Sequence, residues 1–221
     1  MDLYRPYHLK HHRLTQQPTD PDLGLSAPFP ITPTSLRRKM MRDLTGRTAY
    51  QRRRLQLRDA FGAADWPWRR RLARAAARIG PGVVVNVGLA ATLTALGHWY
   101  LYVALWLLPL ATWYQLVSRI RNIAEHAVVP DDDDPLRNTR TTYAGWLERA
   151  LIAPYFVNYH LEHHLLLFVP CFRLRAAHHA LLAKGLAPRM EIQPGYRAML
   201  RLATSAARDR GRDGARSVQQ I

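Results

Sequence analysis

Two clusters of histidine have a spacing that can bind a metal ion. They are HxxHH groups formed by His8, His11 and His12 and by His160, His163 and His164. On a helix, positions i, i+3 and i+4 lie on one face, with neighbouring side chains about 5–6 Å apart. Three imidazoles so placed can converge on a metal, and imidazole suits iron, zinc, copper and nickel.

A third element, Asn122 with His126, has i, i+4 spacing. Together these elements hold more histidines than the four ligands of a structural zinc. The number of histidines is explained more simply by two metals, or by one metal with some histidines bonded to its ligands and not to the metal itself. The zinc-protease pattern HExxH is absent, and HLEHH (160–164) does not match its inverted form HxxEH. Nitrogen ligands without bridging carboxylates leave positions open for a small oxidant, as an oxygen-activating redox metal requires.

The remaining histidines and the acidic run are weaker candidates. His98 fits an interfacial turn, and His178 and His179 fit a helix in which they lie behind the ligands or on the surface. The four carboxylates of Asp131–Asp134 cannot all face one ion, and Pro130 and Pro135 around them indicate a solvated loop.

A helical hairpin in the membrane is the element expected to bring these groups together. Residues 79–118 contain no charged side chain and would form a helix of roughly 60 Å, about twice the thickness of a bilayer core. We place the break at Gly97-His98-Trp99, which predicts spans at about 81–97 and 100–118. The alternative is a pair of buried helices in a soluble core.

Arginines flank both ends of the uncharged run. Five lie between 69 and 78, and Arg119 and Arg121 follow the run. A hairpin keeps both arginine groups in the cytoplasm, whereas a single span would not. All three histidine elements lie outside the hairpin, so we expect them on its cytoplasmic side.

The predicted fold is an all-α integral membrane protein, with one transmembrane hairpin and interfacial helices that carry the histidines. Residues 36–78 suit basic amphipathic helices at the membrane interface, or else a solvated helix pair. The stretch 145–169 is too short to span and fits the membrane surface. One domain is expected over 1–203, and 204–221 has the composition of a disordered tail.

Charge and cysteine content narrow the function classes. Lys and Arg number 32 against 16 Asp and Glu, for a net charge of +16, which suits nucleic acid or an anionic membrane face. Positive charge next to a hydrophobic hairpin favours the membrane, and we expect no nucleic-acid partner. The single Cys171 excludes an intrachain disulfide and fits a reducing compartment. No secretory signal is visible.

The sequence resembles the membrane fatty acid desaturases. The segments that carry the likeness are YHLKHHRLTQQPTDPDL (7–23), RNIAEHAV (121–128) and APYFVNYHLEHHLLLFVPCFRLRAAHH (153–179). Their order around a hairpin agrees as well, so the likeness covers most of residues 4–185. The third segment, NYHxEHH followed by VP and a further histidine, is the most specific.

The resemblance implies a site with two irons, O2 as co-substrate and an acyl chain as substrate. On the family pattern His8, His11 and His12 match the second histidine box, and His160, His163 and His164 match the third. His126 matches a further ligand, and Asn122 would hold metal through water. His178 stands where the family often has a histidine, and a ligand role for it is not implied.

The family's first histidine box and first hairpin have no counterpart in this sequence. We therefore expect a chain that starts too late, or a degenerate relative, with one iron short of ligands and little activity. Arg175 stands where the family often has proline, which affects a local turn.

The leading functional hypothesis is a desaturase-like lipid oxidoreductase acting on a membrane lipid or acyl-CoA. Alternatives are a lipid, carotenoid or alkane hydroxylase or ketolase with the same ligands, or an inactive basic membrane-binding protein. Because no HPGG-type haem segment is present, a separate ferredoxin or b-type cytochrome is implied as electron donor.

Overall fold

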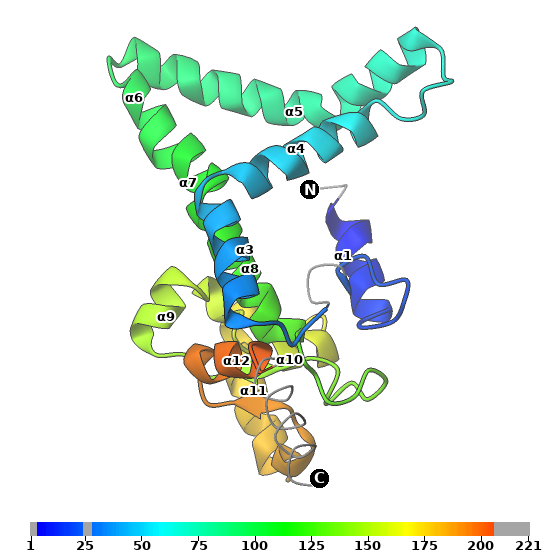
Figure 1. Ribbon diagram of the computed structural model, residues 1–221, viewed down its shortest axis with the longest axis vertical. Coiled ribbons are helices and arrows are strands. Elements are labelled where there is room, and N and C mark those ends of the chain that lie inside the picture. Colours follow the sequence, from blue (N-terminus) through cyan, green and yellow to red (C-terminus); the bar gives the residue numbers. More distant parts are fainter. Residues whose placement is uncertain (1–3, 24–27, 206–221) are drawn as a thin grey trace, which may run out of the picture. The chain divides into compact units, whose positions relative to one another are not determined.

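The computed structural model describes residues 4–23 and 28–205, and most of them are helical (Figure 1). They fall into two compact units, one of Met1–Arg37 with Val117–Ile221 and one of Arg38–Leu116. The domain predicted over 1–203 therefore contains two units. All but the first two residues of the predicted tail 204–221 lie outside the described residues.

The central unit, Arg38–Leu116, contains the uncharged run. Its helices are α4 (Arg47–Ala60), α5 (Trp68–Ala95), α6 (Trp99–Leu101), the π-helical η1 (Tyr102–Leu107) and α7 (Leu108–Ala111). The helix α3 (Pro33–Leu44) leads into it from the other unit. The sequence 36–78 is thus helical over most of its length, as predicted.

The chain reverses at the predicted break. Gly97 adopts φ +76°, which glycine tolerates best, and its amide bonds to the Thr94 carbonyl at 2.9 Å. The His98 amide reaches back to the Leu93 carbonyl at 2.7 Å. This pair of bonds is the Schellman ending of a helix, which caps carbonyls that would otherwise lack partners.

Two helical stretches among the described residues are long and apolar enough to cross a membrane. They are Trp68–Ala95 and Trp99–His126, and they overlap the predicted spans 81–97 and 100–118. The apolar surface of α5 is open to its surroundings, as shown by Val84, which is 71 % exposed. Such a surface suits lipid better than water.

The terminal unit consists of helices joined by long loops. Its helices are α1 (Tyr4–Arg13), the later part of α8 (Trp113–His126), α9 (Trp146–Leu151), α10 (His160–Leu165), α11 (Leu174–Ala183) and α12 (Tyr196–Ala203). Three 3₁₀ turns join them, η2 (Pro154–Phe156), η3 (Cys171–Arg173) and η4 (Ala187–Arg189). The predicted surface stretch 145–169 thus forms α9, η2, α10 and their loops.

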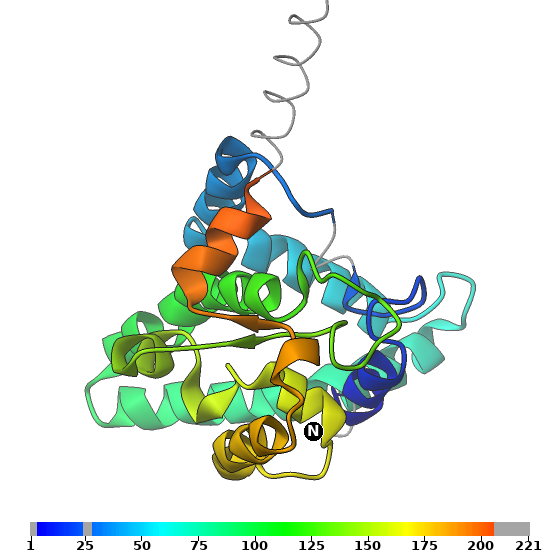
Figure 2. The ribbon, with the colours of Figure 1, turned by 90° about the horizontal axis from the view of Figure 1, so that it is seen from below.

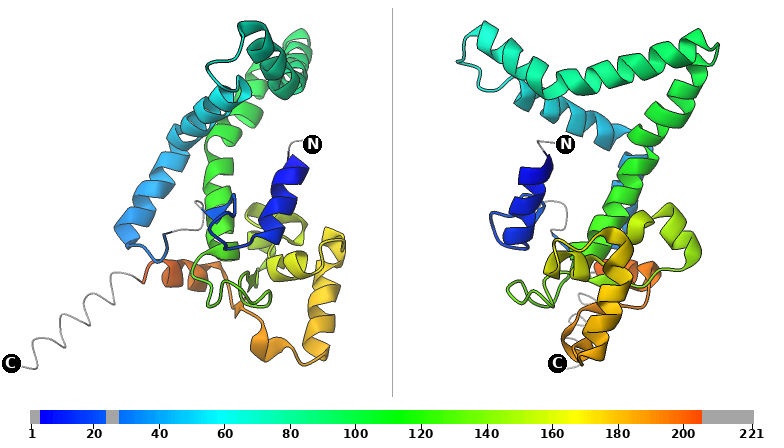
Figure 3. Two further views of the ribbon diagram at one scale, coloured as in Figure 1. Left: turned by 90° about the vertical axis from the view of Figure 1, so that its right-hand side faces the viewer. Right: turned by 180° about the vertical axis from the view of Figure 1, so that it is seen from behind.

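A short parallel pairing crosses this unit, which the all-α prediction missed. Strand β1 (Thr141–Thr142) pairs with β2 (Ile192–Gln193), with Thr141 opposite Ile192. The strands run between α12 on one side and α10 with α11 on the other (Figures 2 and 3). Strands of two residues have no hydrophobic period, so no sequence pattern indicates them.

A buried arginine fixes the loop that leads into β1. Arg140 is 0 % exposed and donates to the carbonyls of Ala127 and Val128, each at 2.8 Å, just after α8 ends. Its Nε donates to Glu191 at 3.0 Å, just before β2. The guanidinium therefore joins the end of α8 to the sheet, and this contact helps to position His126.

Candidate metal centre

The seven histidines singled out by spacing lie in two groups within the terminal unit. One group holds His8, His12 and His163, and the other holds His11, His126, His160 and His164. In each group one nitrogen per ring lies within 4.8 Å of all the others. Helices α1, α8 and α10, far apart in the sequence, supply all seven rings.

The three-histidine group is a triangle of ring nitrogens. The Nε2 atom of His12 lies 3.0 Å from that of His8 and 3.1 Å from that of His163. The third side, between His8 and His163, is 3.2 Å. All three side chains are half-buried.

The four-histidine group is deeper. Its Nε2 atoms follow one another at 3.2 Å (His11 to His126), 2.9 Å (His126 to His160) and 3.1 Å (His160 to His164). Three of these residues are buried, with His11 only 2 % exposed.

Each HxxHH box is divided between the two groups, whereas spacing alone allows all three rings of a box to meet. His8 and His12, at i and i+4, share one group while His11, at i+3, enters the other. In α10 the pair His160 and His164 and the single His163 divide in the same way. Positions i+3 and i+4 point about 100° apart around a helix, so one box can serve two centres about a turn apart.

Two hydrogen bonds fix which ring nitrogens are available in the four-histidine group. The Nδ1 of His11 donates to Asp20 at 2.8 Å, since a carboxylate can only accept. The Thr15 hydroxyl gives its hydrogen to the His11 carbonyl at 2.9 Å and so accepts from Nδ1 of His164 at 3.1 Å. Because Nδ1 is the donor in both rings, the neutral form of each ring presents a lone pair at Nε2.

Hydrogen bonds among these rings cannot account for either group. The Nε2 of a neutral imidazole is either a donor or an acceptor. Among three such atoms, at least two must therefore both be donors or both be acceptors, and these two cannot bond to each other. In the four-histidine group His11 and His164 are acceptors. His126 and His160 would then both have to donate, which leaves two N–H groups facing each other at 2.9 Å. A cation among the lone pairs removes both conflicts.

The spacing within the groups also suits a metal. Two nitrogens about 2.1 Å from one ion and at right angles to each other lie about 3.0 Å apart. The sides of 3.0–3.2 Å in the three-histidine group match this value. Three ligands at right angles occupy one face of an octahedron and leave the opposite face for other molecules.

Burial favours, in several of these rings, the neutral form that metal binding requires. Burial, followed by the neighbouring rings His163 and His8, lowers the pKa of His12 to about 3. Burial, followed by the rings of His8 and His11, lowers the pKa of His163 to about 4. Burial also lowers the pKa of His160 and His164 well below the usual value. The lone pairs of these four rings therefore stay free of protons at neutral pH.

Asn122 lies one helical turn before His126 in α8. Its Oδ1 is buried and has no hydrogen-bond partner within residues 4–23 and 28–205. An oxygen left in this way is compatible with a bound water, and the role of Asn122 in holding metal through water stays a prediction. Glu125, between Asn122 and His126, accepts from Arg121 at 3.2 Å and approaches Nε2 of His160 at 4.0 Å.

Asp20 was not predicted from the sequence. Although burial raises the pKa of its carboxyl, hydrogen bonds from His11 and from the amides of Asp22 and Gln16 hold it below the ordinary value. The carboxylate therefore stays charged behind His11. Such a partner orients the ring and strengthens a histidine ligand.

His178 is buried but is not part of either group. Its Nδ1 donates to Glu162 at 2.6 Å, and its Nε2 is hydrogen-bonded to the Tyr143 hydroxyl at 3.1 Å, so neither ring nitrogen is left for a metal. Glu162, 0 % exposed, also accepts from Thr141 of β1. Through Glu162, this network contacts α10, the helix that carries His160, His163 and His164. In the sequence, the glutamate within HLEHH (160–164) was the one feature that could have indicated this network.

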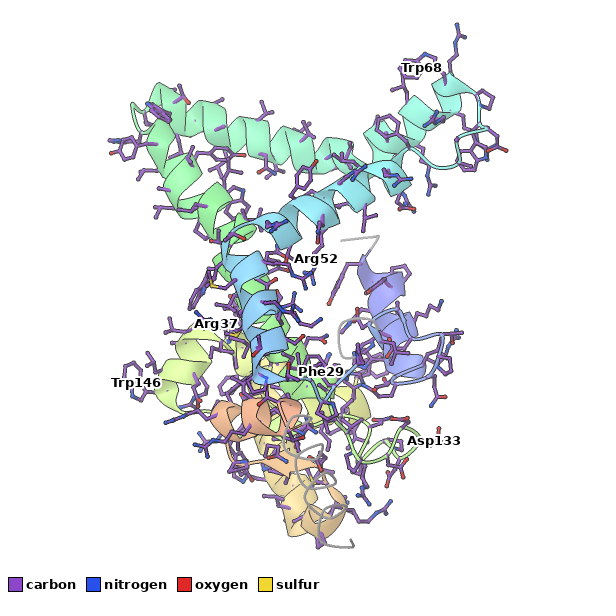
Figure 4. The ribbon with its side chains drawn as sticks, in the orientation of Figure 1. Phe29, Arg37, Arg52, Trp68, Asp133 and Trp146 are labelled. Carbon is purple, nitrogen blue, oxygen red and sulfur yellow. The ribbon has the colours of Figure 1, made fainter. Side chains whose placement is uncertain are left out.

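The other histidines and the acidic run belong to neither group. His98 and His179 are exposed, and His98 contacts Tyr100 at the hairpin turn. In the loop Asp131–Asp134, which contains Asp133 (Figure 4), the side chains of Asp131 and Asp134 accept from backbone amides of the same loop. This agrees with the predicted solvated loop.

Comparison with known proteins gives a family and one relative. The fatty acid desaturase family model matches residues 1–193 of the chain. Dihydrorhizobitoxine desaturase of Bradyrhizobium elkanii is 32 % identical over 94 residues, which are 41 % of this chain and 26 % of that protein. The match thus spans about a quarter of the relative's length. No solved structure matches the chain.

Proposed function

This chain belongs to the fatty acid desaturase family, and on that premise we propose that it is an oxidoreductase with two irons that uses O2 to desaturate an acyl chain. One observation carries the proposal. Two HxxHH boxes and His126 place their ring nitrogens in two groups that hydrogen bonding cannot satisfy and that metal ions can.

The residues of each group would have separate tasks. His8, His12 and His163 would hold one iron, and His11, His126, His160 and His164 the other. Asp20 would fix the orientation of His11, and Asn122 would hold a water beside its group. Bound iron would activate O2 so that it can oxidise an unreactive C–H bond. Overall, one O2, two electrons, two protons and two hydrogen atoms from the acyl chain give two waters and a double bond.

The reaction needs partners that the residues indicate only by class. We propose a membrane lipid or acyl-CoA as substrate, because two helices are apolar enough to cross a bilayer. We place the histidines on the cytoplasmic side, since arginines flank the hairpin at both ends. A separate ferredoxin or b-type cytochrome would deliver the electrons, and the net charge of +16 suits an acidic carrier.

The proposal is tested in two steps. The chain is expressed with iron, purified in detergent and analysed for metal, and it should retain iron that His163→Ala and His164→Ala lose and His179→Ala keeps. The iron-loaded protein is then given lipids, O2 and an electron donor, and products are analysed by mass spectrometry. Loss of two hydrogens supports desaturation, whereas gain of one oxygen atom shows a hydroxylase instead. A folded chain that binds no iron would refute both.

A further inference from the structure

We propose that the central unit, Arg38–Leu116, binds an anionic membrane phospholipid in a cavity between α4, α5 and the η1–α7 segment. The cavity has a volume of about 520 Å³, within the range of ligand sites in proteins. All of its lining residues belong to this unit, and none belongs to the histidine groups. The inference relies on the membrane placement proposed above.

Two arginines contribute to the lining of the cavity. They are Arg53 of α4 and Arg78 of α5. Arg53 bonds to Gln56 at 2.6 Å, and Arg78 pairs with Asp59, itself 72 % exposed at the side chain. A guanidinium has five N–H donors, so each of these contacts leaves donors for a phosphate. Two guanidinium groups suit an anionic headgroup.

The rest of the lining is mainly apolar. This part of the lining includes Val83 and Val87 of α5, Leu107 of η1 and Leu110 of α7. Val83 and Val87 are 53 % and 61 % exposed, so protein does not cover them within the described residues. A cavity lined by both apolar side chains and arginines complements a phospholipid, in which an acyl chain and a charged group are joined.

The depth of the apolar part fits one leaflet of a bilayer. From Ile79 to Ala90, both of which line the cavity, the axis of α5 rises by roughly 16 Å at about 1.5 Å per residue. Half of a bilayer core is about 15 Å. An acyl chain that starts beside Arg78 would therefore end near the middle of the membrane.

The polar groups deeper in the cavity are already satisfied. The Asn86 Oδ1 accepts from the Tyr102 hydroxyl at 3.0 Å and from the Trp106 Nε1 at 2.9 Å, and its amide nitrogen donates to the Gly82 carbonyl at 2.7 Å. These bonds join α5 to η1 and use both hydrogen-bonding ends of Asn86. The charged donors that line the cavity are those of Arg53 and Arg78.

Native mass spectrometry of the full chain in mild detergent tests the site. We expect phosphatidylglycerol to be retained and phosphatidylcholine to bind more weakly. The double variant Arg53→Gln/Arg78→Gln should lower the affinity for phosphatidylglycerol by roughly tenfold or more. A double variant with the same charge, Arg54→Gln/Arg69→Gln, changes residues that do not line the cavity and should bind normally. An equal loss of affinity in both double variants would show that only the net charge matters and would overturn the proposal.

A second pair of variants tests the apolar part. Gly82 lines the cavity and a Cβ there would meet nothing within 4 Å, so Gly82→Leu should fill the space without a clash. Gly88 has the same freedom but does not line the cavity. We expect Gly82→Leu to exclude the lipid and Gly88→Leu to keep it. Retention by both would overturn the proposal, as would displacement of the lipid by millimolar inorganic phosphate. Iron content, measured on the same samples, reports separately on the proposed oxidoreductase.

Discussion

The Nε2 atoms of His8 and His163 lie 3.2 Å apart, although 155 positions separate these residues in the chain. His163 thus shares a group with two residues of α1 and not with its own neighbour, His164. Each box contributes two rings to one group and one ring to the other, so loss of either box would damage both groups.

This division of the boxes predicts an unusual pattern of additivity. We expect His163→Ala to lower the iron content by about one ion per chain, and His12→Ala/His163→Ala to lower it no further, because both residues serve one group. His163→Ala/His164→Ala, within one box, should lower it by about two ions if both sites fill. Elemental analysis measures this, with His179→Ala as control. The same loss from both double variants would contradict the division of the boxes.

Asp20 should set the metal affinity of the four-histidine group. Asp20→Asn keeps the shape but removes the charge that orients His11, and we expect metal affinity to fall by roughly 10–100-fold. Competition with a chelator, followed by metal analysis, gives the value. Asp132→Asn, in the exposed loop, should leave it unchanged. An unaltered affinity in Asp20→Asn would show that the carboxylate only packs against the ring.

His178 should stabilise the fold without holding metal. His178→Ala leaves the buried Glu162 without its histidine partner, and we expect a loss of about 2–4 kcal/mol in the free energy of unfolding. The iron content of the folded protein should not change, because both ring nitrogens of His178 are engaged elsewhere. Thermal unfolding and metal analysis are compared with those of His179→Ala. Loss of iron at full stability would instead make His178 a ligand.

The metal-free protein should lose stability in mild acid. The pKa of His12 is lowered to about 3 and that of His163 to about 4, while an unfolded histidine titrates near 6.5. The unfolded chain therefore takes up protons first, and stability falls as the pH drops from about 6.5 towards 4. Denaturant unfolding at several pH values measures this fall. A flat profile across this window would show that the rings are not buried in the neutral form.

The hairpin predicts that its turn and the histidines lie on opposite sides of the membrane. Cys171, exposed in the loop between α10 and α11, reports the histidine side. In a Cys171→Ser background, His98→Cys reports the turn. We expect an impermeant maleimide to label the two positions from opposite sides of sealed vesicles. Labelling of both from one side would contradict the hairpin.

The arrangement of the candidate site was partly predictable because it depends on local spacing. The HxxHH boxes and the uncharged run predicted which residues would gather and where the chain would turn, and Gly97 ends its helix at the predicted place. These features follow from helix geometry and from the absence of charge over 79–118, both of which are properties of short segments.

Which rings share a group was decided only by tertiary structure. A box offers its i+3 and i+4 rings at different angles, and spacing cannot say which partner each one meets until α1, α8 and α10 pack together. The hydrogen bond between Asp20 and His11 depends on the conformation of a loop. The hydrogen bond between Glu162 and His178 depends on contact between α10 and α11. The pairing of β1 with β2 joins residues about fifty positions apart. Such contacts depend on the position of a second segment, which no local pattern contains.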